Sequence, residues 1–160
     1  MLNEQINKEL YSANLYLSIA SYFTEQEMTG FAHFFLIQVQ EEQLHAMKQF
    51  KYIHDVGGRV KISKLEAPPH TFKNPKNAFE FTLEQERLTT KSINNLVKQA
   101  VSENDYATHT FLQWFVTEQV EEESLINTIL KKLEWVGDNP SALYLLNEEL
   151  AKRTLPKQTT

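Results

Sequence analysis

Glu42 and His45 are residues whose types and spacing could bind a metal ion. They form a Glu-x-x-His motif, and two helical residues three positions apart share one face. The carboxylate and the imidazole would then point in the same direction. Because a motif this short also occurs as two solvated side chains, it needs support from the pattern around it.

The apolar pattern around the motif places Glu42 on a face that should be buried. Spacings of three and four, which are typical of one helix face, connect Phe35, Val39, Glu42, Ala46, Gln49 and Ile53. A buried carboxylate is unfavourable unless it is paired or bound to a metal. We therefore expect other helices to bring partners to Glu42.

The same pattern occurs three more times, each time with a carboxylate near the middle of the apolar stripe. These carboxylates belong to Glu9, Glu86 and Glu122; Gln119 comes one turn before Glu122, and Tyr16 lies seven residues after Glu9 on the same stripe. A single glutamate in such a stripe is often a mis-phased surface residue, but four out of four are hard to explain in that way.

Four carboxylates and one imidazole in a dry core would repel one another unless cations neutralised them. Oxygen ligands with one histidine suit iron or manganese, and zinc is a competitor. The second half of the chain has no histidine near Glu122, so two metal positions would differ, with the histidine at only one.

Five helices should position these side chains, over residues 2–27, 30–56, 77–103, 105–136 and 141–152. Thr29, Asp105 and Ser141 are the expected N-caps. Leu143, Leu146 and Leu150 form one apolar face of the short fifth helix. We expect residues 1–160 to form a single domain, with a bundle over about 2–136 and a frayed tail over 154–160.

The segment from Arg59 to Lys76 contains three prolines and no helical period. A helix of 25 residues is about 38 Å long, and 18 extended residues reach about 60 Å. The segment can therefore cross the whole bundle and set the second and third helices parallel. The sequence predicts an all-α, four-helix bundle with a long crossover and a short fifth helix.

Composition excludes several other classes of function. The net charge is −5 with no basic patch, so we expect no nucleic-acid partner. The chain has no cysteine, which excludes disulfides, thiolate zinc sites and cysteine nucleophiles. Without a signal-peptide pattern or an apolar run long enough for a membrane, the expected location is the cytoplasm.

Three stretches of the sequence resemble bacterial non-haem ferritins: Leu2–Ser12, Gln40–His45 and Phe111–Glu123. The likeness extends over nearly the whole chain, including the crossover and the fifth helix. It implies a ferritin-like fold, an iron-storage cage of 24 subunits, and a ferroxidase centre in each bundle that oxidises Fe(II) with dioxygen or hydrogen peroxide. In this family the fifth helix packs against its symmetry mates around a four-fold axis.

The resemblance also implies a role for each candidate residue. Glu9, Glu42 and His45 would bind the first iron, with Glu42 bridging to the second. The remaining implied roles are as follows: Glu86 and Glu122 as ligands of the second iron with Gln119 beside them, Glu41, Glu118 and Glu121 at a third iron site, and Tyr16 assisting electron transfer.

Two positions depart from related patterns. Haem-binding bacterioferritins have a methionine immediately after the bridging glutamate, whereas this chain has Gln43, so we expect no haem. Many bacterial ferritins have a histidine where this chain has Val120, a position that should face away from the centre. His33, His54, His70 and His109 have no carboxylate partner at ligand spacing and are interpreted as surface or structural residues.

Two other readings remain open from sequence. One is a soluble di-metal oxidase or peroxidase of the rubrerythrin type, against which the absence of cysteine counts. The other is a structural bundle that binds no metal, against which the four interrupted stripes count.

Overall fold

The computed structural model describes residues 1–155, and within them all regular structure is helical. The bounds of the five helices are α1 Leu2–Glu25, α2 Thr29–Asp55, α3 Pro75–Ser102, α4 Tyr106–Val136 and α5 Pro140–Leu150. These bounds confirm the predicted helices to within two residues at each end. Of the predicted tail over 154–160, residues 154 and 155 have no regular structure and 156–160 lie outside the described residues.

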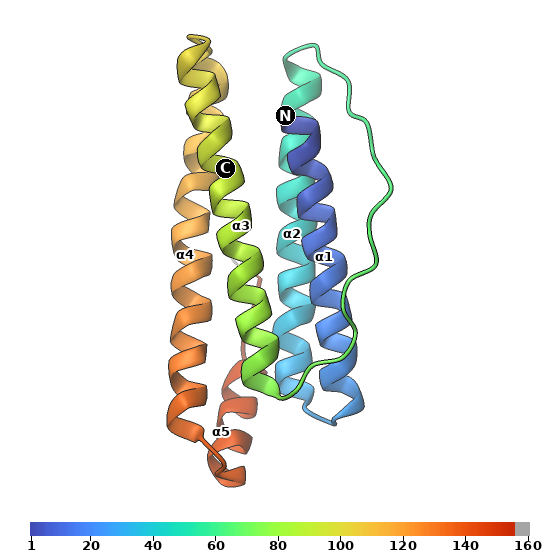
Figure 1. The fold of residues 1–160 in the computed structure, drawn as a ribbon, viewed down its shortest axis with the longest axis vertical. Helices are drawn as coiled ribbons and strands as arrows, with labels where there is room; N and C mark the ends of the chain where they lie inside the picture. Colours follow the sequence, from blue (N-terminus) through green and yellow to red (C-terminus); the bar gives the residue numbers. More distant parts are fainter. Residues whose placement is uncertain (156–160) are drawn as a thin grey trace.

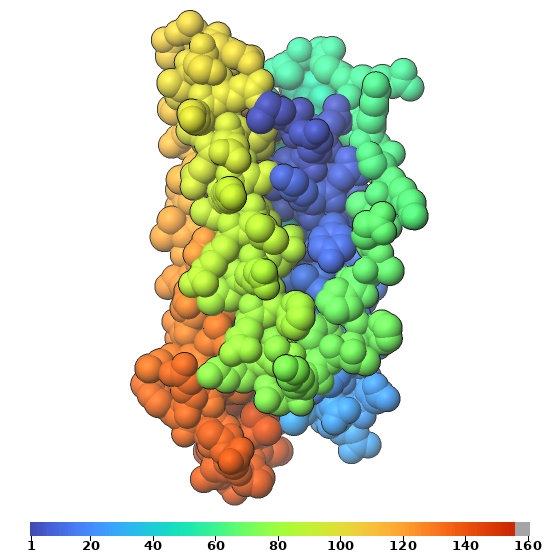
Figure 2. Space-filling view, viewed as in Figure 1, coloured from blue at the N-terminus to red at the C-terminus, as the bar shows by residue number. Residues whose placement is uncertain are grey.

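Two antiparallel hairpins, α1–α2 and α3–α4, pack side by side to form the bundle (Figure 1). The segment between α2 and α3 returns along the full length of the bundle, so α2 and α3 run parallel, as predicted. Figure 2 shows this crossover lying along α1. Asn3 and Asn7 hold it there, since their side chains bond to the backbone of Arg59, Lys61 and Ser63.

Residues at the helix ends explain where most helices begin. Asp105 accepts a hydrogen bond from the backbone N–H of Thr108 and caps α4, as predicted. Asn74 caps α3, where Pro75 occupies the first turn, a position in which its missing N–H costs nothing. The prediction for α5 was wrong by two residues, because Asn139 rather than Ser141 accepts the capping bonds.

The prediction that Thr29 caps α2 was also wrong. The side chain of Asn147, from α5, accepts hydrogen bonds from the N–H groups of Gly30 and Phe31 at 2.8 and 3.2 Å. Gly30 is required for this approach, because a Cβ at this position would lie 1.8 Å from the carbonyl oxygen of Asn147. The short fifth helix is thereby attached to the bundle of its own chain.

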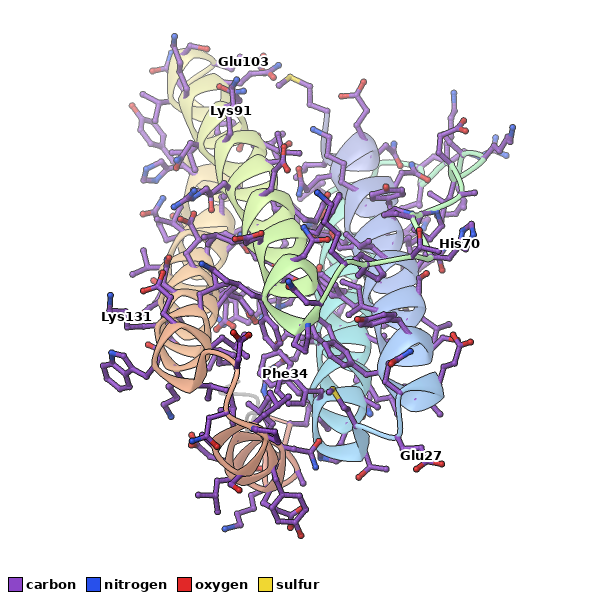
Figure 3. All side chains as sticks on the ribbon, turned by 60° about the horizontal axis from the view of Figure 1, so that its bottom comes forward. Glu27, Phe34, His70, Lys91, Glu103 and Lys131 are labelled. Carbon is purple, nitrogen blue, oxygen red and sulfur yellow. The ribbon has the colours of Figure 1, made fainter. Side chains whose placement is uncertain are left out.

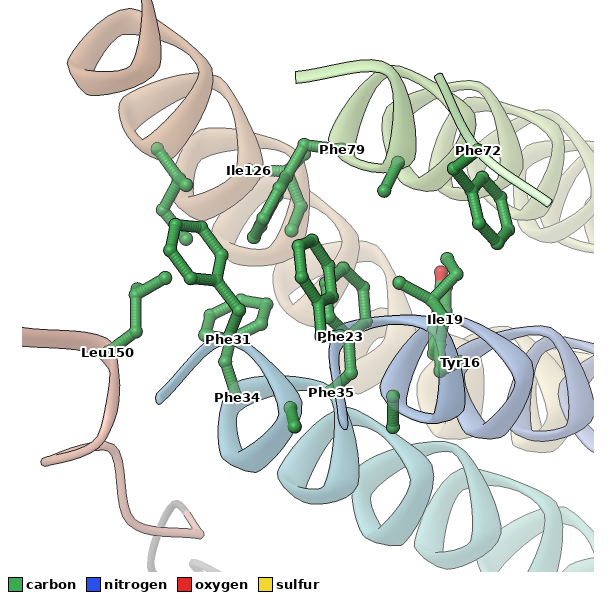
Figure 4. Packing of buried hydrophobic residues seen from close by; sticks show 14 of the residues in the cluster. Tyr16, Ile19, Phe23, Phe31, Phe34, Phe35, Phe72, Phe79, Ile126 and Leu150 are labelled. Atoms are coloured by element: carbon green, nitrogen blue, oxygen red, sulfur yellow. The ribbon is translucent and has the colours of Figure 1, made fainter. Parts of the chain in front are cut away.

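An aromatic core fills the end of the bundle nearest α5 (Figure 4). The ring of Phe79 lies 5.0 to 6.4 Å, centroid to centroid, from those of Phe23, Phe31, Phe34 and Phe35. Leu146 and Leu150 of α5 are buried in the same core. The apolar face of α5 therefore packs, through these two leucines, against the bundle of its own chain.

Smaller apolar clusters occupy the opposite end of the bundle, around Ile93 and Phe115 and around Ile6 and Ile53. Charged side chains such as those of Lys91 and Lys131 lie on the outside of the bundle, as Figure 3 shows. Between the two apolar ends, each of the four long helices contributes a buried glutamate. The fold thus encloses a polar layer at mid-bundle.

Candidate metal centre

The first hairpin brings three ligand-type side chains together. Glu9 of α1 and Glu42 and His45 of α2 each offer one ligand atom, and these atoms lie within 4.8 Å of one another. All three residues are buried. The structure therefore assembles the first group of residues proposed from the sequence.

His45 is suited to bind a cation as a neutral imidazole. Burial, with a smaller contribution from Lys48, lowers the pKa of His45 to about 4. Its ring meets the edges of Trp114 and Phe115, with centroids 5.4 and 6.0 Å away. Aromatic packing thus orients the ring, and the nitrogen lone pair is available at neutral pH.

Amide groups position the carboxylate of Glu9. The side-chain nitrogens of Gln5 and Gln49 both donate to its Oε1, at 3.0 and 2.9 Å. The second oxygen of Glu9 and one oxygen of Glu42 are buried without a hydrogen-bond partner among the described residues. Because buried polar atoms are almost always paired, these two oxygens fit a site built for a metal ion.

The second hairpin contributes a second pair of carboxylates. Glu86 of α3 accepts hydrogen bonds from the hydroxyl of Tyr16 and from the amide of Gln119, the latter at 3.1 Å. Glu122 of α4 accepts from the amide of Gln38 at 3.0 Å. The structure thus places Gln119 and Tyr16 as hydrogen-bond donors to a carboxylate of the centre.

Electrostatics link the two hairpins through Glu42. Burial, followed by the charges of Glu86, Glu9 and Glu122, raises the pKa of Glu42 well above its usual range. Burial and Glu122 raise the pKa of Glu86 to about 8. Glu42 therefore interacts with carboxylates of both groups, which is the position a bridging ligand needs.

The residues of the expected third site differ in their surroundings. Glu41 is buried and ion-paired with Arg153 at 2.6 Å. Glu118 is half-buried, and Glu121 is exposed. Burial and the charges of Glu121 and Glu122 raise the pKa of Glu118, so these carboxylates form one acidic group beside the buried centre.

Three glutamines and one arginine were given no role from the sequence. Gln5, Gln38 and Gln49 donate to Glu9 or Glu122, and Arg153 pairs with Glu41. Gln5 stands four residues before Glu9, a spacing from which contact on one helix face could have been predicted. The contacts of Gln38, Gln49 and Arg153 join different elements, so no local spacing indicates them.

The remaining histidines lie away from the centre, in agreement with the sequence interpretation. The ring of His33 contacts the carbonyl oxygen of Arg153, His109 is half-buried, and His54 and His70 are exposed. Figure 3 shows His70 on the crossover at the outside of the bundle. Val120 is 68% exposed and faces away from the centre, as expected.

The fold and this buried layer of carboxylates define a class of protein, the ferritin-like four-helix bundles. The comparisons with known proteins agree. The model of the family described as ferritin-like domain matches residues 1–136. A probable bacterial non-heme ferritin-like protein of Haemophilus influenzae is 41% identical over 94% of this chain and 91% of its own.

Other relatives and solved structures are similar over nearly their full length. The bacterial non-heme ferritin of Campylobacter jejuni is 39% identical over 99% of this chain and 95% of its own. An engineered closed form of Archaeoglobus fulgidus ferritin has a TM-score of 0.95 at 47% identity, covering 97% of this chain and 94% of that one. The chain belongs to the ferritin family.

Proposed function

We propose that this protein is a cytoplasmic iron-storage ferritin that oxidises Fe(II) at a di-iron centre in each bundle. The first iron would bind Glu9, Glu42 and His45, and the second would bind Glu86 and Glu122 and share Glu42. Twenty-four subunits would enclose the ferric mineral. The relatives named above are ferritins. The cage and its subunit number are what the resemblance to that family implies.

The convergence of Glu9, Glu42 and His45 is the observation that carries the proposal. Glu86 and Glu122 are buried on the opposite hairpin and interact electrostatically with Glu42. Among the described residues, no lysine forms an ion pair with these four glutamates. Two Fe(II) substrate ions would supply the missing positive charge.

The chemistry follows from this ligand set. Carboxylate oxygens stabilise Fe(III) more strongly than Fe(II), because they are hard anionic ligands. Two irons held together lose one electron each, and the two electrons reduce dioxygen to hydrogen peroxide, or hydrogen peroxide to water. Each of these reductions also takes up two protons from solvent. Tyr16, whose hydroxyl is hydrogen-bonded to Glu86, would assist the electron transfer.

Stopped-flow iron oxidation at two Fe(II) per subunit tests the centre. Glu42→Ala removes the shared ligand and should slow the rapid phase by more than about tenfold, the lower end of the cost of losing even an outer-shell partner. Glu118→Ala alters only the expected third site and is the matched control. Parent-like oxidation by Glu42→Ala would place the centre elsewhere.

Native mass and iron content after aerobic loading test the storage cage. A storage ferritin should give a large cage that retains far more iron than the two ions bound by each centre. A small oligomer with two irons per subunit would instead indicate a di-metal oxidase without a cavity. A protein that binds no iron would overturn the proposal.

A further inference from the structure

Arg153 lies just beyond α5 and extends back to the middle of α2. One guanidinium nitrogen, Nη2, donates to Oε2 of Glu41 at 2.6 Å. The two side chains are only 14% and 6% exposed. This ion pair therefore differs from exposed pairs, which screening makes weak.

Other contacts hold the arginine in place. Its guanidinium carbon lies 4.3 Å from the centroid of the Phe34 ring, within the range of a cation–π interaction. The backbone carbonyl oxygen of Arg153 meets the ring of His33 at 2.8 Å. These contacts fix a permanent positive charge beside α2.

The charge is placed within the acidic group of the expected third iron site. Glu41 interacts electrostatically with Glu122 and Glu118 as well as with Arg153. Arg153 also acts on Glu122, although burial remains the larger influence on the pKa of that residue. Over residues 1–155, Arg153 is the only lysine or arginine that forms an ion pair with a buried carboxylate of the centre.

The guanidinium is itself incompletely satisfied. Its other terminal nitrogen, Nη1, is buried without a hydrogen-bond partner in the described part of the chain. A buried unpaired donor is unfavourable. The pair therefore has an energetic cost in the folded protein, which fits a contact that can be exchanged for another.

We propose that Arg153 is a positioning residue that competes with iron for Glu41 and so sets the affinity of the third iron site. The inference rests on the function proposed above. Arginine has only donors, so its guanidinium cannot itself bind a metal ion, and a metal ion on the same oxygen of Glu41 would lie next to that positive charge. If a metal bound the other oxygen of Glu41, two cations would lie side by side and repel each other.

The competition has a direction. The permanent charge of Arg153 orients Glu41 while no third iron is bound, and weakens the binding of that iron. Within residues 1–155, no lysine or arginine forms an ion pair with the di-iron ligands Glu9 and Glu42. Iron should therefore fill the two central positions first and enter the third only when it displaces Arg153.

The test is an anaerobic Fe(II) titration that counts ions bound per subunit and measures the affinity of each. Arg153→Gln removes the competing charge and should tighten binding of the third ion by roughly 5- to 150-fold, the usual range of coupling between two sites. Affinities of the first two ions should change little. Lys152→Gln, an exposed neighbour with the same loss of charge, is the matched control and should behave as the parent.

Arg153→Lys keeps the charge but not the planar guanidinium, so it should raise the affinity for the third ion by less than Arg153→Gln does. It also tests the proposal if Arg153→Gln does not fold. Adding Glu41→Gln to either variant should abolish the increase in affinity for the third ion. A crystal saturated with Fe(II) should show Arg153 withdrawn from Glu41 in subunits that hold the third ion.

Each other outcome has a distinct meaning. If Arg153→Gln lowers thermal stability but leaves the third ion unchanged, the arginine only anchors the chain end and the inference is wrong. If parent and variant both bind two ions and no third, the inference is wrong and the di-iron proposal stands. If neither binds two ions, the proposed function itself fails.

Discussion

At the scale of residues, the centre consists of acids that the folded protein protonates more readily than the unfolded chain does. The pKa of Glu86 rises from 4.5 to about 8, and that of Glu41 likewise. Between pH 4.5 and about 8 the native state binds more protons at these two groups than the unfolded state does. These groups therefore make the free energy of unfolding fall as pH rises. His45, with its pKa lowered to about 4, acts in the opposite direction between pH 4 and 6.5.

The first prediction concerns this pH dependence. Between pH 6.5 and 8 only the carboxyls act, so the chelator-treated protein should lose stability with rising pH, by up to about 1.4 kcal/mol per pH unit for each such group. Denaturant unfolding with chelator at several pH values measures the slope. Glu86→Gln should flatten it, and an unchanged slope in this variant would show that Glu86 does not titrate there.

The second prediction concerns the amides around Glu9. Gln49→Leu keeps the volume similar but removes a donor to Glu9, and loss of such an outer-shell partner typically weakens metal affinity 10- to 100-fold. Anaerobic titration should show this loss at the first ion. Gln43→Leu, an exposed neighbour of Glu42, is the control. Equal affinities in the two variants would argue against positioning by Gln49.

Stripe periodicity was sufficient to place the glutamates Glu9, Glu42, Glu86 and Glu122 in the core, because a helix has one buried face. It could not reveal that Gln38, from α2, bonds to Glu122 on α4, because that contact depends on how two hairpins pack. The pairing of Arg153 with Glu41 escaped prediction for the same reason. A chain end has no periodicity that shows where it docks.

At the scale of elements, α5 is integral to the bundle. Asn147 caps α2, and Leu146 and Leu150 complete the aromatic core. The apolar face of α5 was visible in the sequence, but the surface that it covers was not. Truncation after Gly137 should therefore destabilise the bundle itself, because it would expose that core and remove the cap of α2.

The third prediction tests the attachment of α5. In Gly30→Ala the added methyl group would overlap the backbone of Asn147, which cannot yield as a flexible side chain would. The variant should release α5, and we expect faster proteolysis between Val136 and Leu150 together with a lower melting temperature. Thr29→Ala, one residue earlier and exposed, should resemble the parent. Equal proteolysis would show that α5 is held by other contacts.

At the scale of the whole molecule, the subunit leaves large apolar side chains uncovered near α5. Trp135, Tyr144 and Leu145 are 76%, 63% and 68% exposed. Since the inner face of α5 is already used, we propose that these three residues belong to a surface that contacts neighbouring subunits. No helix in residues 1–155 is long and apolar enough to cross a membrane.

The fourth prediction follows for assembly. Tyr144→Glu with Leu145→Glu should place charges in the contacts between subunits and prevent closure of the cage, while each bundle remains helical. Native mass spectrometry and circular dichroism measure the two properties. Lys131→Gln with Lys152→Gln, also exposed, changes the net charge by the same amount and is the control. An intact cage from the Tyr144 and Leu145 variant would assign assembly to other surfaces.

From the crossover between α2 and α3 we infer that metal binding takes part in the folding of a subunit. Glu9, Glu42 and His45 belong to one hairpin, and Glu86 and Glu122 belong to the other. The centre therefore lies at the interface between the two hairpins. The crossover joins the two hairpins and so raises their effective concentration. The carboxylates of the two hairpins repel one another as the hairpins approach, and bound cations would remove that repulsion. A newly made chain would therefore fold most readily where iron is plentiful, which is when iron storage is needed.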